Sequence, residues 1–200
     1  MEPKRKPSRR IQILQAAARV FARLGFDKAT IKQIAREAGM RAPALIYWYY
    51  HNKRALFQAV LEKYSLLTQD LSDPDRLDSQ PPEQVLTTLG TRFLHTFEDP
   101  EAVRLFRILL AETAHNEETA TYFAERSILP FQKFLVKYLE KQAQAGRLRF
   151  HNAQTMARAF LGSLVMYVMA QGLFPMVREG QPAYGDYVQE VVQTFLRGLQ

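Results

Sequence analysis

Apolar residues recur at steps of three and four along nearly the whole chain, and no stretch alternates between apolar and polar positions as a half-buried strand does. This spacing predicts an all-α fold. The first helix is expected to place Ile11, Leu14 and Phe21 on one face. Ser8 is its expected N-cap, and Gly25 is expected to mark its C-terminus.

Three further helical patterns follow in the first third of the chain. One opens at Thr30, whose hydroxyl can accept a hydrogen bond from the second or third amide of the helix, and it stops at Gly39. The next begins near Pro43, because proline in a first turn lacks only an N–H that would be unpaired there. The last begins near Asn52 and runs toward Leu71.

Residues 72–82 are polar and are interpreted as a loop or linker, after which helical patterns resume. The expected helices are Pro82–Phe97, Glu101–Ala114, Glu117–Ala145 with a break or kink at Pro130, Asn152–Gly172 and Tyr184–Leu199. The pattern therefore predicts about nine helices, three of them in an N-terminal head.

The net charge of +7 is unevenly distributed over the 200 residues. Residues 1–54 hold 13 Lys and Arg against 3 Asp and Glu, a net +10, whereas residues 55–200 hold 14 against 17, a net −3. A basic head on a mildly acidic body is typical of a nucleic-acid-binding module. A basic segment lying on a membrane surface would give the same asymmetry, so both interpretations remain at this point.

A possible membrane span lies in the nineteen uncharged residues from 159 to 177. Gly162, Ser163 and Gln171 interrupt this stretch and Pro175 would end it. A helix covered by protein on most sides, with a partner subunit as its cover, is therefore favoured over a span. No apolar run follows the basic N-terminus as in a secretory signal, so we expect a cytoplasmic protein without membrane contact.

The segment from Thr30 to Leu45 has the spacing of a helix-turn-helix unit. The small side chain of Ala35 lets a second helix pack closely, and Gly39 permits a sharp turn with positive φ four residues later. In such a unit the second helix enters the major groove of DNA. Within a segment of net charge +10, this spacing indicates duplex DNA as the partner.

Residues 9–67 resemble the DNA-binding domain of the TetR family of bacterial transcription regulators. The matching runs are Ile13-Leu-Gln-Ala-Ala-Ala-Arg-Val-Phe, Gly25-Phe, Thr30-Ile-Lys-Gln-Ile-Ala, Ala38-Gly39, Leu45-Ile-Tyr-Trp-Tyr-Tyr and Asn52-Lys-Arg-Ala-Leu-Phe. The resemblance implies a helix-turn-helix DNA-binding domain over residues 1–54, or to about 67 with the connecting fourth helix. It implies a helical ligand-binding and dimerisation domain over residues 68–200. A homodimeric repressor is then expected, one that binds a palindromic operator and is released by a small apolar or aromatic effector.

The residues expected at the DNA are Thr30, Lys32, Arg41, Ala42, Ala44, Tyr47, Trp48, Tyr49 and Lys53. Thr30 and Lys32 would touch phosphate. Lys53 would do so as well, because its cation lies beside the unpaired amides of a helix start; its other interpretation is a solvated surface lysine. Arg41 is the candidate for guanine recognition.

The aromatic run from Tyr47 to Tyr50 cannot lie wholly in a core, because successive residues of a helix point about 100° apart. We expect Tyr47 and Trp48 to reach DNA and Tyr50 to pack inward, as the family's usual Phe does. Stacking of single-stranded bases on these rings is the alternative. Gly39 and Tyr47 are eight residues apart, one more than is common in the family, so the face that the recognition helix presents stays open.

In the body, the resemblance implies an effector pocket and a dimer interface. The side chains that could line the pocket are Phe93, Phe97, Phe106, Arg107, Tyr122, Phe123, Phe134, Tyr138 and Met166. An anionic end of the ligand would be held by Arg104 or Arg107. The apolar residues expected to pair with a second subunit are Phe160, Leu161, Leu164, Val168, Val188, Val191 and Phe195. Aromatic stripes of this kind are also typical of a plain core.

The sequence does not predict an enzyme. The four histidines lack metal-ligand spacing, cysteine is absent, and neither a glycine-rich phosphate loop nor a nucleophile elbow occurs. We therefore expect no cofactor and no metal, with double-stranded DNA, a small-molecule effector and a second copy of the chain as partners. The alternative is a non-sensing architectural or other nucleic-acid-binding protein, which would share the basic head.

Overall fold

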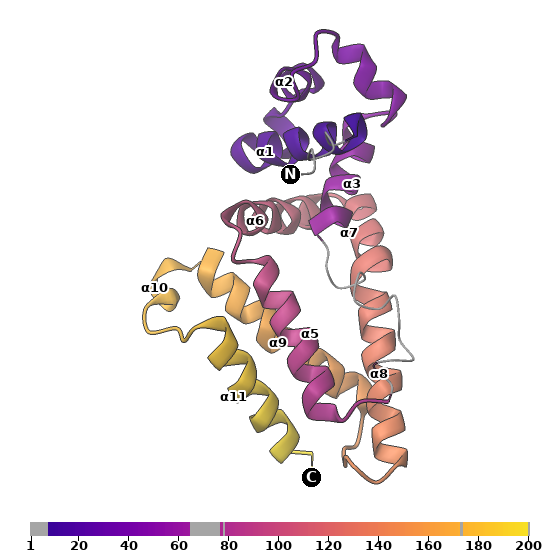
Figure 1. Cartoon of the computed structure of the whole chain (residues 1–200), viewed down its shortest axis with the longest axis vertical. Coiled ribbons are helices and arrows are strands. Elements are labelled where there is room, and N and C mark those ends of the chain that lie inside the picture. Colours follow the sequence, from indigo (N-terminus) through magenta and orange to yellow (C-terminus); the bar gives the residue numbers. More distant parts are fainter. Residues whose placement is uncertain (1–7, 65–76, 78, 173, 200) are drawn as a thin grey trace, which may run out of the picture. The chain divides into compact units, whose positions relative to one another are not determined.

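The computed structural model of the protein describes residues 8–64, 77, 79–172 and 174–199, with only the backbone of Tyr64, Pro175 and Arg178. Within these residues the regular elements are helices and no strand occurs (Figure 1), so the all-α prediction is confirmed. The chain divides into two compact units. The first comprises residues 1–64 and 104–123, and the second comprises residues 65–103 and 124–200.

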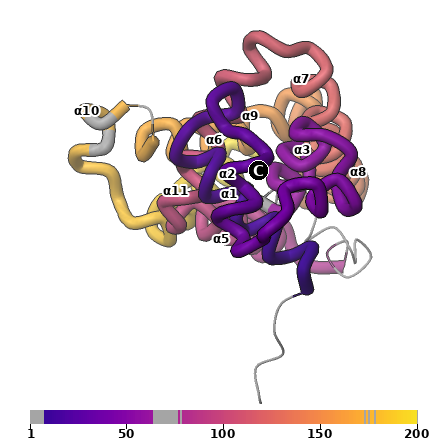
Figure 2. Tube along the Cα trace, turned by 90° about the horizontal axis from the view of Figure 1, so that it is seen from above, coloured from indigo at the N-terminus to yellow at the C-terminus, as the bar shows by residue number. Residues whose placement is uncertain are grey.

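The first unit is built from the N-terminal helices and a later helical segment. Its elements are α1 (Arg9–Lys28), α2 (Ile31–Glu37), the 3-10 helix η1 (Pro43–Trp48), α3 (Lys53–Tyr64), most of α6 (Pro100–His115) and α7 (Glu117–Phe123). Helix α1 contacts both α2 and α3, and Figure 2 shows these three helices gathered together. We refer to the segment from α1 to α3 as the head.

The head has an aromatic core. The ring of Phe57 lies 5.1 Å from that of Phe21 and 4.9 Å from that of Phe26, measured between centroids. Leu105 and Leu109 of α6 belong to the same buried cluster. The later segment therefore stabilises the head by adding apolar area to its core.

The start of α1 agrees with the expectation from the sequence, whereas the helix resumes after a kink at Gly25 and continues to Lys28. The hydroxyl of Ser8 accepts a hydrogen bond from the amide of Ile11 and caps the helix. Gly25 leaves the helical conformation with a φ of 78°, which lets the chain turn before α2. Helix α3 is described from Lys53 to Tyr64; the expected extension to Leu71, and residues 72–76 and 78 of the expected linker, lie outside the described residues.

The second unit, called the body here, contains α5 (Pro82–Thr96), the π-helical turn η3 (Ala124–Ile128), α8 (Leu129–Gln144), α9 (Ala153–Gly172), α10 (Pro175–Arg178) and α11 (Tyr184–Arg197). Helix α11 packs on α5 and α9, and α8 packs on α9. The approach of α5 to α11 depends on Gly90, because a Cβ atom there would lie 3.0 Å from Cγ1 of Val188.

The bounds of α5, α6, α9 and α11 match the expected helices within two residues, but the helix expected over Glu117–Ala145 is divided into α7, η3 and α8. The irregular turn precedes Pro130 instead of lying at it. A proline ring clashes with the carbonyl four residues earlier, which here is that of Arg126 inside η3. Helix α10 was not predicted, because four residues are too few to show a period.

Candidate nucleic-acid interface

The turn after α2 has the hydrogen bonds that a helix-turn-helix unit requires. Thr30 caps α2 as predicted: its hydroxyl accepts a hydrogen bond from the amide of Gln33 at 3.2 Å, and the Gln33 side chain accepts one from the amide of Thr30 at 2.8 Å. At the other end, Gly39 has a φ of 67° and the amide of Met40 donates to the carbonyl of Ala35 at 2.9 Å. This closure ends α2 and directs the chain into η1.

Two inward side chains fix η1 on the head. Ile46 is completely buried, and Tyr50, just after the helix, is 6% exposed, which confirms the expectation that Tyr50 packs inward. The guanidinium of Arg10 lies 5.8 Å from the centroid of the Tyr50 ring. The helix starts with Pro43 and makes no side-chain cap, so its amino end is open toward solvent.

The outward face of η1 and its flanks carries most of the residues predicted at the DNA. Thr30, Lys32, Arg41, Ala42, Ala44, Tyr47, Trp48 and Tyr49 are all exposed. The exposed fraction reaches 82% for Trp48 and 51% for Tyr47, which is unusual for large aromatic side chains. Leu45, whose apolar side chain the sequence predicts as a contact between the two helices of the unit, is instead exposed on the same segment. Its position next to Ala44 was the signal that could have placed it among the residues predicted at the DNA.

Lys53 differs from the other predicted contacts because its ammonium group is engaged within the head. Nζ donates to the carbonyls of Phe26 at 2.8 Å, Asp27 at 3.2 Å and Ala29 at 3.1 Å. It also lies 4.4 Å from the centroid of the Phe26 ring. An ammonium group has three donors, and the three carbonyls use all of them. The group left for phosphate at this position is therefore the backbone amide at the start of α3.

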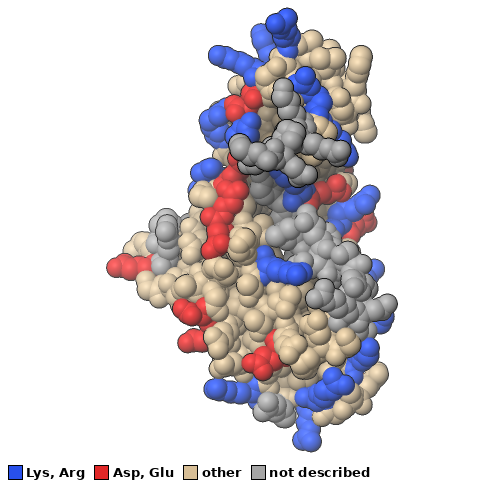
Figure 3. All heavy atoms as spheres, viewed as in Figure 1, with Lys and Arg blue, Asp and Glu red and all other residues tan. Residues whose placement is uncertain are grey.

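Lys and Arg side chains gather over the head in Figure 3. Two of them are paired: Arg19 and Arg23 of α1 approach the carboxylate of Glu37 at 2.9 Å and 3.4 Å. The hydrogen bond from Arg19 is the main reason why the pKa of Glu37 lies below its ordinary value. This pairing ties α1 to the end of α2, and it leaves Lys32 exposed on α2 and Arg41 exposed in the turn before η1.

Helix α7 holds both ends of α3 through polar contacts. Nη1 of Arg54 donates to the hydroxyl of Thr119, a buried side chain, at 3.1 Å. One turn further along α7, the hydroxyl of Tyr122 donates to the Glu62 carboxylate at 2.6 Å. The orientation of α3 within the first unit is therefore fixed by α7 as well as by α1.

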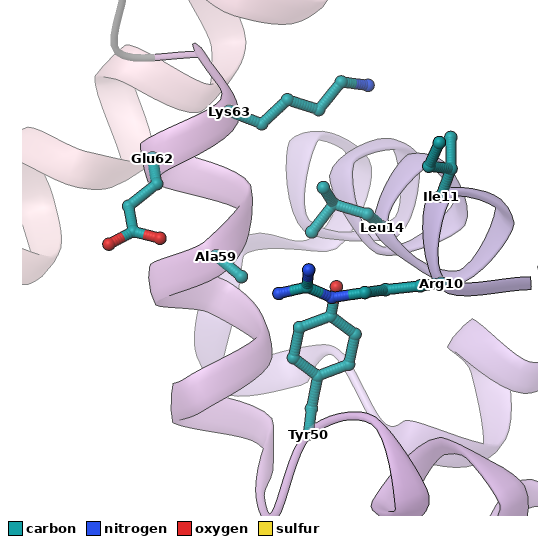
Figure 4. A pocket seen from close by; sticks show the side chains of 7 residues that line it. All are labelled: Arg10, Ile11, Leu14, Tyr50, Ala59, Glu62 and Lys63. Atoms are coloured by element: carbon teal, nitrogen blue, oxygen red, sulfur yellow. The ribbon is translucent and has the colours of Figure 1, made fainter. Parts of the chain in front are cut away.

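A pocket of about 280 Å³ opens between α1 and α3 beside Tyr50 (Figure 4). It is lined by Arg10, Ile11, Leu14, Tyr50, Ala59, Glu62 and Lys63. None of these residues is among those predicted for an effector pocket.

The predicted effector residues are distributed over both units. Phe93 pairs with Phe97 at 5.3 Å and Phe134 with Tyr138 at 6.2 Å in the body, measured between ring centroids. Tyr138 is completely buried, and its hydroxyl donates to the carbonyl of Gln80 at 2.8 Å. The remaining residues of that prediction lie elsewhere: Phe106, Arg107, Tyr122 and Phe123 belong to the first unit, and Met166 is exposed on α9.

The residues predicted for the dimer interface fall into two groups. Phe160, Leu164, Val168 and Val188 are completely buried by the chain's own helices. Leu161, Val191 and Phe195 are partly exposed. The first group therefore forms core between α9, α5 and α11, and these four side chains are not available to a second subunit.

Within the described ranges no three His, Asp or Glu side chains are grouped so that they could hold a metal ion. No helix in the same part of the chain has the length and apolar character needed to cross a bilayer.

The capped helix, its glycine turn and an exposed segment in a basic head define the chain as a helix-turn-helix protein. Residues 13–60 match the bacterial regulatory proteins of the tetR family, and residues 84–198 match the C-terminal domain of AefR-like transcriptional repressors. The chain belongs to the TetR family, as the motifs of its sequence predicted.

Individual relatives agree with this assignment. The probable HTH-type transcriptional regulator ArpR of Pseudomonas putida is 38% identical over 73 residues, which are 34% of this chain and 34% of ArpR. The chain thus matches about a third of the length of that curated relative. The fatty acid degradation regulator FadR from Bacillus halodurans has the same fold, with a TM-score of 0.77, 21% identity and coverage of 98% of this chain and 99% of FadR. The transcriptional regulator FadR from Bacillus subtilis, solved in complex with stearoyl-CoA, also has this fold, with a TM-score of 0.77 and 17% identity. The match covers 95% of this chain and 99% of that FadR.

Proposed function

We propose that the protein is a transcriptional repressor that binds a palindromic DNA operator as a homodimer and is released by a small apolar or aromatic effector. The observation that carries this proposal is the outward face of η1. It exposes Tyr47 and Trp48, and Arg41 is exposed in the turn just before it, in a segment of net charge +10. Adjacent exposed aromatic side chains beside cations are typical of a binding surface, and duplex DNA is the partner that fits both properties.

The roles within this interface follow from the chemistry of each side chain. Lys32 and the amide groups at the start of α3 are suited to phosphate oxygens, and they position the head on the duplex. Arg41 precedes η1 and is exposed, so its guanidinium can reach the N7 and O6 atoms of a guanine. The hydroxyls of Tyr47 and Tyr49 can donate to the DNA backbone.

Binding as a dimer would require a surface that the single chain leaves uncovered. Ala159, Gly162 and Met166 of α9 are exposed and lie on one face of the helix, and a Cβ atom at Gly162 would meet nothing within 4 Å. In a two-fold symmetric dimer, the α9 helix of the second copy would pack against this face and bury it. Two heads related in this way would read two half-sites, which makes the operator palindromic.

The first experiment selects bound sequences from random duplexes with the purified protein. A palindromic consensus, with an affinity that falls steeply as salt is raised, is the expected result. Lys32→Ala should weaken binding to all duplexes and reduce the salt slope by about one. The control is Lys137→Ala, which removes an exposed cation from α8 in the body and should change neither quantity. Recovery of no consensus, together with equal affinity for all duplexes, would favour the architectural alternative.

The second experiment tests the dimer face by sedimentation. Gly162→Glu adds a charge where the single chain has open space, so it should leave the fold intact and produce monomers. Gly185→Glu, at the start of α11, also meets open space and is the matched control that should remain dimeric. Dimers of the Gly162 variant would show that another face carries the interface.

The third experiment concerns the effector. A ligand releases DNA only if it binds the released conformation better than the DNA-bound one, so it must be added to the complex with the selected duplex. Stearoyl-CoA, the ligand in the solved FadR complex from Bacillus subtilis, is an apolar probe with an anionic end, and a neutral aromatic compound is its counterpart. Binding to the protein without any change in operator affinity would contradict release by that ligand.

A further inference from the structure

The part of η1 that would meet the bases has no hydrogen-bonding side chain. Four consecutive exposed residues, Ala42, Pro43, Ala44 and Leu45, carry only aliphatic groups. In a helix-turn-helix unit the first residues of the recognition helix are the ones that reach base edges. The base contacts at this point must therefore be made by methyl and methylene groups.

The geometry of η1 separates this aliphatic end from the polar groups that follow. Side chains three residues apart eclipse one another in a 3-10 helix, so Ala44 lies in one row with Tyr47 and Leu45 in another row with Trp48. Ile46 points into the core between these rows. In each row the aliphatic residue comes first, and the aromatic residue with an O–H or N–H group comes one turn later, further from the amino end.

Neighbouring polar side chains do not replace the missing donors. The side chain of Gln33, which could otherwise read adenine, is held by Thr30: its Oε1 atom accepts from the Thr30 amide at 2.8 Å and from the Thr30 hydroxyl at 2.9 Å. Arg41, just before the aliphatic residues, is the exposed guanidinium next to them and is suited to guanine.

Only one base presents an apolar group in the major groove. Thymine carries a methyl group at C5, whereas the edges of the other bases present hydrogen-bond donors and acceptors that an aliphatic surface would leave unpaired. We propose that Ala44 and Leu45 recognise the 5-methyl groups of thymines next to a guanine read by Arg41. This inference rests on the proposed function, because it names the bases that the same interface reads.

The cations around this apolar patch favour DNA over a protein partner as its occupant. Lys32, Arg36 and Arg41 are exposed on α2 and at the turn, so an apolar protein surface placed here would have to desolvate them. A duplex brings phosphates to these cations and thymine methyl groups to the aliphatic residues at the same time.

The experiment replaces thymines of the selected duplex by uracil, which removes only the 5-methyl group. Replacing a contacted thymine should lower the affinity of the protein for the duplex about fourfold, the effect of one buried methyl group. The sensitive positions should be symmetric in the two half-sites. In the Leu45→Ala variant, uracil should no longer lower the affinity at the thymine that Leu45 contacts. Arg41→Ala, the matched control, should weaken binding while leaving the uracil effect unchanged. Because the uracil series uses the unaltered protein, its result does not depend on how a variant folds.

Four outcomes decide the question. Sensitivity to uracil at paired positions, lost in Leu45→Ala, supports the proposal. Tight binding to the selected duplex with no loss at any uracil overturns it while the proposed function stands. Failure to bind any duplex overturns both, and capture of an apolar peptide at this patch in place of DNA has the same consequence.

Discussion

The ammonium group of Lys53 donates a hydrogen bond of 2.8 Å to the carbonyl of Phe26, twenty-seven residues earlier in the chain. With two further carbonyls, those of Asp27 and Ala29, it holds the last residues of α1 and the link to α2 against the start of α3. A charge at a position expected to face phosphate thus also stabilises the head. The two roles can be separated by experiment.

Lys53→Met keeps the length of the side chain and removes the three hydrogen bonds. We expect the free energy of unfolding to fall by about 2 kcal/mol, since hydrogen bonds to charged groups are stronger than neutral ones. Lys32→Met, at an exposed position of α2, should leave stability unchanged. Thermal melting measures both. At a temperature where the variant is folded, we expect an unchanged salt slope of DNA binding, because the three donors of the ammonium group are used within the head. A slope reduced by about one would show that the ammonium group contacts phosphate.

The sequence could predict the features of the head that depend on local chemistry. Ser8, Thr30 and Gly39 have cap and turn roles that side-chain type alone indicates, and the structure has them in those roles. It could not predict the partner of Lys53, because the three carbonyls come together only when α1 and α3 pack. A lysine that binds carbonyls and a lysine in solvent look the same in a sequence.

The body shows a second limit of the same kind. The apolar character of Phe160 and Leu164 can be recognised in the sequence, but a pattern does not tell which element covers an apolar face, and these two side chains are buried within one chain.

The position of the irregular turn η3 shows a third limit, because the sequence predicts the break at Pro130 itself. The clash that a proline causes lies with the carbonyl four residues earlier, which moves the irregularity toward the amino end.

Glu37 links α1 and α2, and its pKa is lowered chiefly by the hydrogen bond from Arg19. A carboxylate with a lowered pKa adds stability above its ordinary pKa of 4.5, and this contribution is lost as the pH falls through the lowered value. We therefore expect Glu37→Gln to melt at a lower temperature than the unaltered protein at pH 7. The difference in melting temperature should shrink as the pH falls from 4.5 through the lowered pKa.

The matched control for this variant is Glu140→Gln, which changes an exposed carboxylate of α8. It should alter the melting temperature little at either pH, because surface carboxylates without good geometry contribute little. A difference for the Glu37 variant that stays constant from pH 7 to pH 3 would show that the carboxylate charge is not what holds α1 to α2.

Glu112 of α6 is the opposite case. Burial raises its pKa, and the nearby charge of Asp27 adds to the effect, while Arg54, Lys53 and His115 oppose it. The folded state then binds a proton more tightly than the unfolded state, so stability is greater below pH 4.5 and falls as the pH rises through the raised value. Glu112→Gln should raise the melting temperature slightly at pH 7 and leave it unchanged near pH 3. A lower melting temperature at pH 7 would show that the attraction to the nearby cations outweighs burial.

Gly90 permits the approach of α5 to α11. In Gly90→Ala the new Cβ atom would lie 3.0 Å from Cγ1 of Val188 and 3.6 Å from Cδ2 of Leu164, both of which belong to fully buried side chains. The gain in helix propensity is about 1 kcal/mol, and overpacking a filled core costs about 1–3 kcal/mol. We expect a net loss of stability in chemical denaturation. Gly185→Ala, where the new atom meets nothing within 4 Å, should not be destabilised, and equal stability of the two variants would mean that α11 shifts freely.

Trp48 is the single tryptophan of the chain, and it is 82% exposed on η1. Its fluorescence therefore reports directly on the surface that is proposed to meet DNA. Titration with the selected duplex should shift the emission to shorter wavelength, because the ring leaves water. Titration with a duplex of scrambled sequence at the same salt concentration should shift it less.

Trp48→Ala completes this test, because the position is too exposed to support the core. The variant should keep its melting temperature within the small range of surface substitutions while losing affinity for the selected duplex. Tyr187→Phe is a control for general effects of altering an aromatic residue, since its hydroxyl donates to the carbonyl of Ser163 within the body. An unchanged affinity of Trp48→Ala, with no shift in emission of the unaltered protein, would place DNA on a different surface of the head.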